Sequence, residues 1–233
     1  VARTHQPRSL GVGAATRSGL MGPRYSTGVG EQRLVQLADG SRVRLDTDTR
    51  VAVRFSGERR LVRLQRGQAM FDVAHDAHRP FIVEAGAADV RALGTRFDVR
   101  RDAGHVRVTL VEGRVEVRPT GGAPTAAVIL RPGEQVFANG GLSHPRPADI
   151  SAATSWVDGR LLFHAIPLRQ AVAEMNRYSR RRIVLTAPDV ADETISGAFD
   201  TGNVDGFVSA VSRLHGLRTE NDDKEIRLLS ETS

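Results

Sequence analysis

Two similar stretches decide the fold, Leu64-Gln-Arg-Gly-Gln-Ala-Met-Phe-Asp-Val73 and Leu110-Val-Glu-Gly-Arg-Val-Glu-Val117. In each, a short strand pattern of alternating apolar and polar residues precedes a glycine, and a second strand pattern follows it. A glycine inside a strand pattern marks a bend, since it has no side chain to obstruct one. Gly67 and Gly113 therefore predict a β domain that uses one glycine corner at least twice.

The stretch from Gln32 to Val117 contains only short runs of this kind, separated by turn residues and never interrupted by a segment of helix length. Asp39-Gly40 predicts a hairpin, because glycine supplies the positive φ that tight hairpins need. Pro132-Gly133 is expected to be the turn of the last strand pair, within 128–137. Short and regularly spaced strands predict a sandwich, a jelly roll or a solenoid-like β domain.

Residues 158–230 follow a mixed pattern that repeats after 36 residues, so that Phe163 corresponds to Phe199. Each repeat predicts one helix with an apolar face, and Asn203 and Gly216 are suited to cap the second helix. We expect both faces to be core, namely Leu168, Val172, Met175 and Tyr178, with Phe207, Val208, Val211 and Leu214. The expected fold class is mainly β plus α+β, a β-rich jelly-roll or solenoid-like domain followed by a small two-repeat βαβ domain.

We divide the chain into a disordered lead-in over 1–27, a β domain over 28–140, a linker over 141–157 and the α+β module over 158–230. The lead-in has too few apolar residues to offset the entropy of ordering, and the linker is rich in Gly, Pro and Ser. The chain begins at Val1 without a methionine or the pattern of a signal peptide, so we expect a fragment or a processed product.

The net charge of +6 comes almost entirely from arginine, Lys224 being the only lysine. Arginines alternate with aliphatic residues, as in Arg42-Val43-Arg44-Leu45 and Arg107-Val108-Thr109, which predicts solvated strand faces and argues against a nucleic-acid site. The lack of cysteine excludes disulfides and thiolate metal sites. No apolar run reaches the roughly 18 residues that a membrane-spanning helix needs.

Few residues suggest cofactor or catalytic chemistry. A phosphate-binding loop would need a lysine after its glycines, and no nucleophile elbow or His-Glu-x-x-His motif occurs, which argues against a hydrolase. Trp156 is expected to pack at a domain junction rather than stack on a ligand. A cluster of polar residues follows a predicted strand and precedes Pro80, namely Asp72, His75, Asp76 and His78. We interpret this cluster as a connector and expect neither a metal nor a cofactor.

Gly94-Thr95 has the residue types for self-cleavage. A threonine hydroxyl can attack the carbonyl carbon just before it where the backbone is bent, and glycine permits such a bend. The alternative is a corner between two strands in which the threonine bonds to local backbone groups, and the residue types alone favour that corner.

Several stretches together resemble the β domain of the FecR family of regulators: 30–45, 67–76, 79–83, 92–97, 111–117 and 130–133. Trp156, Gly159 and the segment from Pro167 to Ile183 resemble the family's C-terminal module, which is similar to the short N-terminal domains of secretins and TonB-dependent transducers. The sequence departs from the family pattern where Asp46 and Asp98 replace expected asparagines and Gln68 replaces the usual glutamate.

The resemblance implies a signal relay in the periplasm. The C-terminal module, within Gly159 to Leu229, would contact the periplasmic signalling domain of a TonB-dependent outer-membrane receptor and thereby control an extracytoplasmic-function sigma factor. Family members bind the sigma factor through an upstream helical region and cross the inner membrane once, and neither part is visible here. The alternative function is an envelope-associated β module that binds glycan or protein for structural reasons.

Overall fold

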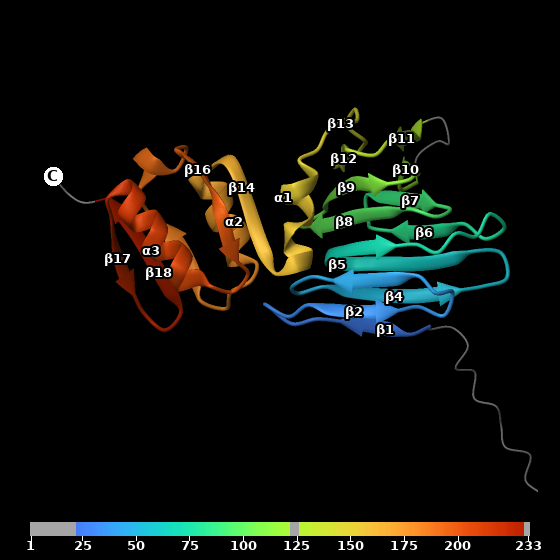
Figure 1. Ribbon diagram of the computed structural model, residues 1–233, viewed down its shortest axis with the longest axis horizontal. Helices are drawn as coiled ribbons and strands as arrows, with labels where there is room; N and C mark the ends of the chain where they lie inside the picture. Colours follow the sequence, from blue (N-terminus) through green and yellow to red (C-terminus); the bar gives the residue numbers. More distant parts are fainter. Residues whose placement is uncertain (1–21, 122–125, 231–233) are drawn as a thin grey trace, which may run out of the picture.

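The computed structural model describes residues 22–121 and 126–230, which form a β domain and a smaller α+β domain side by side (Figure 1). Residues 1–21, most of the predicted disordered lead-in, lie outside the described residues. Strand β1 (Arg24–Ser26) lies inside that predicted range and pairs with β4, so the prediction is wrong there. Tyr25 of β1 packs against the core of the β domain, which supplies the apolar contact that orders this segment.

The β domain is a sandwich of two layers that share one long strand. In the first layer the order is β1, β4, β5, β6, β7, β10, β11, and in the second it is β2, β3, β5, β8, β9, β12, β13. Among the described strands of the β domain, β5 and β6 form the one parallel pair. The bounds are β2 (Arg33–Gln36), β3 (Arg42–Leu45), β4 (Arg50–Phe55), β5 (Arg60–Asp72), β6 (Phe81–Glu84), β7 (Ala88–Ala92), β8 (Arg96–Asp102), β9 (His105–Glu112), β10 (Val115–Pro119), β11 (Val128–Leu130), β12 (Glu134–Ala138) and β13 (Arg146–Pro147).

Glycine corners carry the chain from one layer to the other, as the sequence predicts. Strand β5 pairs within the first layer before Gly67 and within the second layer from Gly67 onward, and Gly67 has a φ of +85°. A Cβ at this position would lie 2.3 Å from Oγ1 of Thr49, so only glycine fits. Gly113 makes the same crossing between β9 and β10. Gly133 does so between β11 and β12, which do not pair with each other, so the predicted pairing of these last two strands is wrong.

The C-terminal domain follows the predicted order of strand, helix and strand twice, but its strands form two separate sheets, one of β14 and β16 and one in the order β15, β18, β17. Its first strands, β14 (Arg160–Pro167) and β16 (Thr194–Asp200), pair with each other, and Phe163 packs against Phe199 at 5.7 Å between ring centres. Asn203 accepts a hydrogen bond from Gly206 N, and Gly216 ends the second helix, as predicted. The remaining elements are α2 (Leu168–Asn176), β15 (Arg182–Leu185), the 3-10 turn η3 (Pro188–Val190), α3 (Val204–His215), β17 (Leu217–Asn221) and β18 (Glu225–Ser230).

Leu214 is the one predicted core residue of these helices that is not buried, with 64% of its surface exposed. Its counterpart Tyr178 is buried because α2 ends at Asn176 and the chain turns toward the β domain, whereas α3 continues straight through Leu214.

The predicted linker is ordered for much of its length. It contains β13, helix α1 (Ile150–Thr154) and the 3-10 turn η2 (Ser155–Asp158), and Asp149 caps α1 by accepting a hydrogen bond from Ala152 N. The polar composition of this stretch therefore reflects capping rather than flexibility. Within 22–121 and 126–230 no helix combines the length and apolarity needed to cross a membrane.

We expect Val211→Ala to lower the free energy of unfolding by about 1–3 kcal/mol, because it leaves a cavity at a fully buried position of α3. Leu214→Ala, one turn further along the same helix, should change it by less than about 0.5 kcal/mol. Chemical denaturation of both variants measures the difference, and equal losses would contradict this assignment of the helix faces.

Candidate functional site at the domain junction

The outer face of the second layer is covered by the C-terminal domain. Cross-strand pairing places Met70, Asp98 and Thr109 side by side on β5, β8 and β9, and all three are buried. Met70 belongs to the same apolar cluster as Trp156 and the helices of the C-terminal domain. The prediction that Trp156 packs at a domain junction is therefore confirmed.

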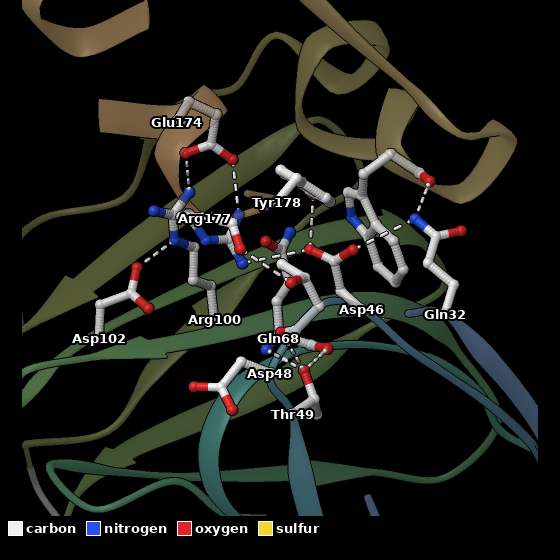
Figure 2. A network of polar contacts seen from close by, with 12 residues as sticks. Gln32, Asp46, Asp48, Thr49, Gln68, Arg100, Asp102, Glu174, Arg177 and Tyr178 are labelled. Carbon is white, nitrogen blue, oxygen red and sulfur yellow. Dashed lines mark hydrogen bonds and ion pairs between the residues drawn. The ribbon is translucent and has the colours of Figure 1, made fainter. Parts of the chain in front are cut away.

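A buried carboxylate joins the two domains. Asp46 lies at the end of β3, has no exposed surface, and accepts hydrogen bonds from Tyr178 Oη at 2.7 Å and Arg177 Nη2 at 3.1 Å (Figure 2). Gln32 Nε2 donates to Asp46 at 3.2 Å and to the backbone oxygen of Trp156 at 2.7 Å. Burial raises the pKa of Asp46, while Arg177 and the tyrosine hydroxyl act against this shift.

A second carboxylate, supplied by the C-terminal domain, has a partner in the β domain. Glu174 of α2 accepts from Arg100 Nη1 of β8 and from Arg177 Nη1, each at 2.6 Å (Figure 2). Burial alone would raise the pKa of Glu174, but these two guanidinium groups hold it at about 2. Thr47 adds a backbone link, because its hydroxyl donates to the carbonyl oxygen of Arg177 at 2.8 Å. The C-terminal domain is thus fixed to the β domain by charge-assisted hydrogen bonds.

Asp98 is a further fully buried acid near the junction. Gln68 Nε2 donates to both of its carboxylate oxygens at 3.1 Å, and Arg107 Nη2 lies 3.9 Å away. Burial raises the pKa of Asp98 to about 6, although Arg107 and Gln68 favour the charged form. The prediction of solvated arginines is therefore wrong for Arg107, whose side chain is only 26% exposed because the C-terminal domain lies over it.

The structure places Gly94 and Thr95 at the corner between β7 and β8, apart from the residues of the junction. Thr95 is 7% exposed, and its hydroxyl has no hydrogen-bond partner among the described residues. His75 packs against Gly94 so closely that a Cβ there would lie 2.8 Å from His75 Nδ1. The backbone oxygen of Thr95 accepts from Val73 N at 2.9 Å. A cavity of about 370 Å³ borders the corner.

The residues considered for a metal site are used in other contacts. Asp72 forms an ion pair with Arg42 on the neighbouring strand, and Asp76 accepts from the backbone of His78 and from Arg79. Within the part of the chain that the structure describes, no three His, Cys, Asp or Glu residues gather in a way that could hold a metal ion.

Comparison with known proteins identifies the β domain. The sequence model of the family described as FecR protein matches residues 23–116. This part of the chain is therefore a FecR domain. A crystal structure of a proposed anti-sigma factor from Parabacteroides distasonis ATCC 8503 resembles this chain with a TM-score of 0.76 at 29% identity, covering 90% of this chain and 100% of that one. A second crystal structure of such a factor from the same organism gives 0.75 at 29% identity, with 90% and 99% covered. A comparison with curated proteins finds no match.

The pKa of Asp98 generates a prediction about stability and pH. In the folded protein the pKa of Asp98 is about 6, whereas its ordinary value is 3.8. The folded state therefore binds the proton of the Asp98 carboxyl more tightly than the unfolded state does, and the protein loses stability as the pH rises from 3.8 to about 6. Asp98→Asn removes that loss and should raise the free energy of unfolding by up to about 3 kcal/mol above about pH 7. Urea unfolding across pH tests this, with the exposed Asp223→Asn as control; if both variants follow the wild-type pH profile, Asp98 is ionised without penalty.

Proposed function

We propose that this chain is the signal-receiving, periplasmic part of an anti-sigma regulator. In this proposal the C-terminal domain binds the periplasmic signalling domain of a TonB-dependent outer-membrane receptor, and binding controls an extracytoplasmic-function sigma factor through an upstream region of the same protein. The FecR domain over residues 23–116 and the likeness to proposed anti-sigma factors support the regulatory role.

The open edge of β16 is the reason for choosing this strand as the binding surface. Strand β16 pairs only with β14 among the described strands, and β14 separates it from the β domain (Figure 1). Its exposed residues are small and uncharged over most of its length, namely Thr194, Ser196, Gly197 and Ala198. Charged side chains commonly protect strand edges from pairing, and β17 carries two of them, Arg218 and Glu220. The edge of β16 therefore suits a partner that adds a strand.

Ala198→Lys should weaken binding of the signalling domain by about tenfold or more, because it places a charge on this edge. The matched control is Thr219→Lys, at an exposed position of β17, which should bind like the wild type. Biolayer interferometry with the signalling domains of the TonB-dependent receptors of the same organism measures both. Binding that is unaffected by Ala198→Lys would rule out the β16 edge, and the absence of binding to any such domain would rule out the receptor as partner.

The corner at Gly94-Thr95 supports a second candidate activity, self-cleavage. The Thr95 hydroxyl would attack the Gly94 carbonyl carbon, the C–N bond would break, and the nitrogen would take up a proton to leave an ester on the Thr95 oxygen. Water would then hydrolyse the ester to a Gly94 carboxylate and a free hydroxyl. The buried Thr95 hydroxyl favours this step, since no hydrogen bond from the described residues holds it. The imidazole of His75 lies beside Gly94 and would accept the proton once it moves within hydrogen-bond distance of that hydroxyl.

Denaturing mass spectrometry of the purified chain should reveal a fragment that begins at Thr95 and is absent from Thr95→Ala. Thr109→Ala removes another buried, unpartnered hydroxyl and is the control that should still be cleaved. His75→Gln should slow the appearance of the fragment by at least about tenfold if the imidazole acts as the base. Wild-type protein that stays intact through long incubation would show that the pair is only a strand corner.

A further inference from the structure

A cavity of about 510 Å³ lies between the two domains, next to the ion pairs of the junction. One wall is the outer face of the second layer, with Arg107 of β9 and Phe137 of β12. The other wall comes from the C-terminal half, with Trp156 of η2 and the apolar residues Leu161 and Ile166 of β14. Its volume falls in the range of small-molecule sites, and its walls combine apolar side chains with polar and charged ones.

The other guanidinium groups near this cavity are already neutralised by the protein. Arg100 contacts Asp102 and Glu174, and Arg177 contacts Glu174 and Asp46. Each therefore has two carboxylate partners within ion-pair distance, and neither needs a further anion.

Arg107 differs from them. Asp98 is the one carboxylate for which the structure gives an ion pair with Arg107, and at 3.9 Å the contact is too long for a hydrogen bond. The Nε atom of Arg107 is buried and has no hydrogen-bond partner within the described ranges. Gln68 already donates to both oxygens of Asp98. The charge of Arg107 thus faces the cavity with incomplete compensation from the protein, which is costly for a buried cation.

A second donor on the opposite wall has the same deficiency. Trp156 is 2% exposed, and its Nε1 has no hydrogen-bond partner in the part of the chain described. A buried indole N–H usually has an acceptor, and leaving it without one costs free energy. Two residues that line the cavity therefore each carry a buried donor without a partner among the described residues, one of them on a cation, and an acceptor that reached both would satisfy them.

The acids on the walls do not fill this role, because each is held elsewhere. Asp102 and Glu174 bind Arg100. Asp149 accepts from Ala152 N and Ser151 Oγ at the start of α1, and these bonds lower its pKa to about 2. A carboxylate that accepts hydrogen bonds from both Arg107 and Trp156 would therefore belong to a ligand.

We propose that the interdomain cavity is a binding site for a small carboxylate with an apolar body, whose oxygens accept from Arg107 and Trp156. The apolar body would pack against Phe137, Leu161 and Ile166. A free organic acid and the carboxyl end of a peptide share this chemistry. Because both domains contribute to the walls, bound carboxylate stabilises the arrangement in which they are joined. The site is independent of the β16 edge and of the corner at Thr95.

The test uses the whole chain and isothermal titration calorimetry with three probes. These are 3-phenylpropionate as a free acid, N-acetylphenylalanine as the end of a peptide, and 3-phenylpropanamide, which keeps the shape of the first probe but has no charge. At least one of the two acids should bind, and the amide should bind about tenfold more weakly or not at all. The tighter of the two acids identifies the source of the carboxylate.

Variants locate the site. Arg107→Gln should weaken binding of the acid by about tenfold or more, and Trp156→Phe, which keeps an aromatic ring but loses the N–H, by about threefold or more. Arg54→Gln, at an exposed position of β4 that does not line the cavity, should bind like the wild type. The proposal is overturned if neither acid binds at millimolar concentration, if acid and amide bind equally, or if folded Arg107→Gln and Trp156→Phe both retain wild-type affinity.

Discussion

The carboxylate of Asp46 is fully buried in the β domain, and the C-terminal domain supplies its cationic partner and two of its hydrogen bonds. A buried charge without partners is strongly unfavourable, so the position of Asp46 in the β domain requires Arg177 and Tyr178 of the C-terminal domain to remain in contact with it. Glu174 imposes the reverse requirement, since it depends on Arg100 of the β domain. The two domains therefore neutralise each other's buried charges, and the cavity between them exists only in this arrangement.

Local patterns in the sequence predicted most strands of the β domain and the two longer helices of the C-terminal domain. Gly67 and Gly113 mark the layer crossings because a positive φ and a crowded Cβ position leave no alternative to glycine. Caps and apolar periodicity indicated the helices for similar reasons. Leu214 was placed wrongly because periodicity shows which residues share a face, but not whether the neighbouring structure extends far enough to cover the end of that face.

The polar contacts of the junction were not predicted, because its polar residues resemble those of a solvated strand. Arg100 and Arg107 alternate with core residues of β8 and β9, and this alternation is the same for a face in water and a face under a polar domain interface. The departures at Asp46 and Asp98 were the available signal, since an acid at each position needs a partner when it is buried. The order within 141–157 was also missed, because capping residues and linker residues have the same composition.

Denaturant unfolding of Arg177→Met tests most directly whether the two domains neutralise each other's buried charges. Two probes monitor the unfolding, the fluorescence of Trp156 at the junction and far-ultraviolet circular dichroism. We expect the two probes to coincide in the wild type and to separate in the variant, with a loss of about 3–5 kcal/mol, because Asp46 loses its cationic partner. Arg169→Met, which breaks an exposed ion pair with Asp192, should behave like the wild type. Coincident transitions and unchanged stability in Arg177→Met would contradict the account.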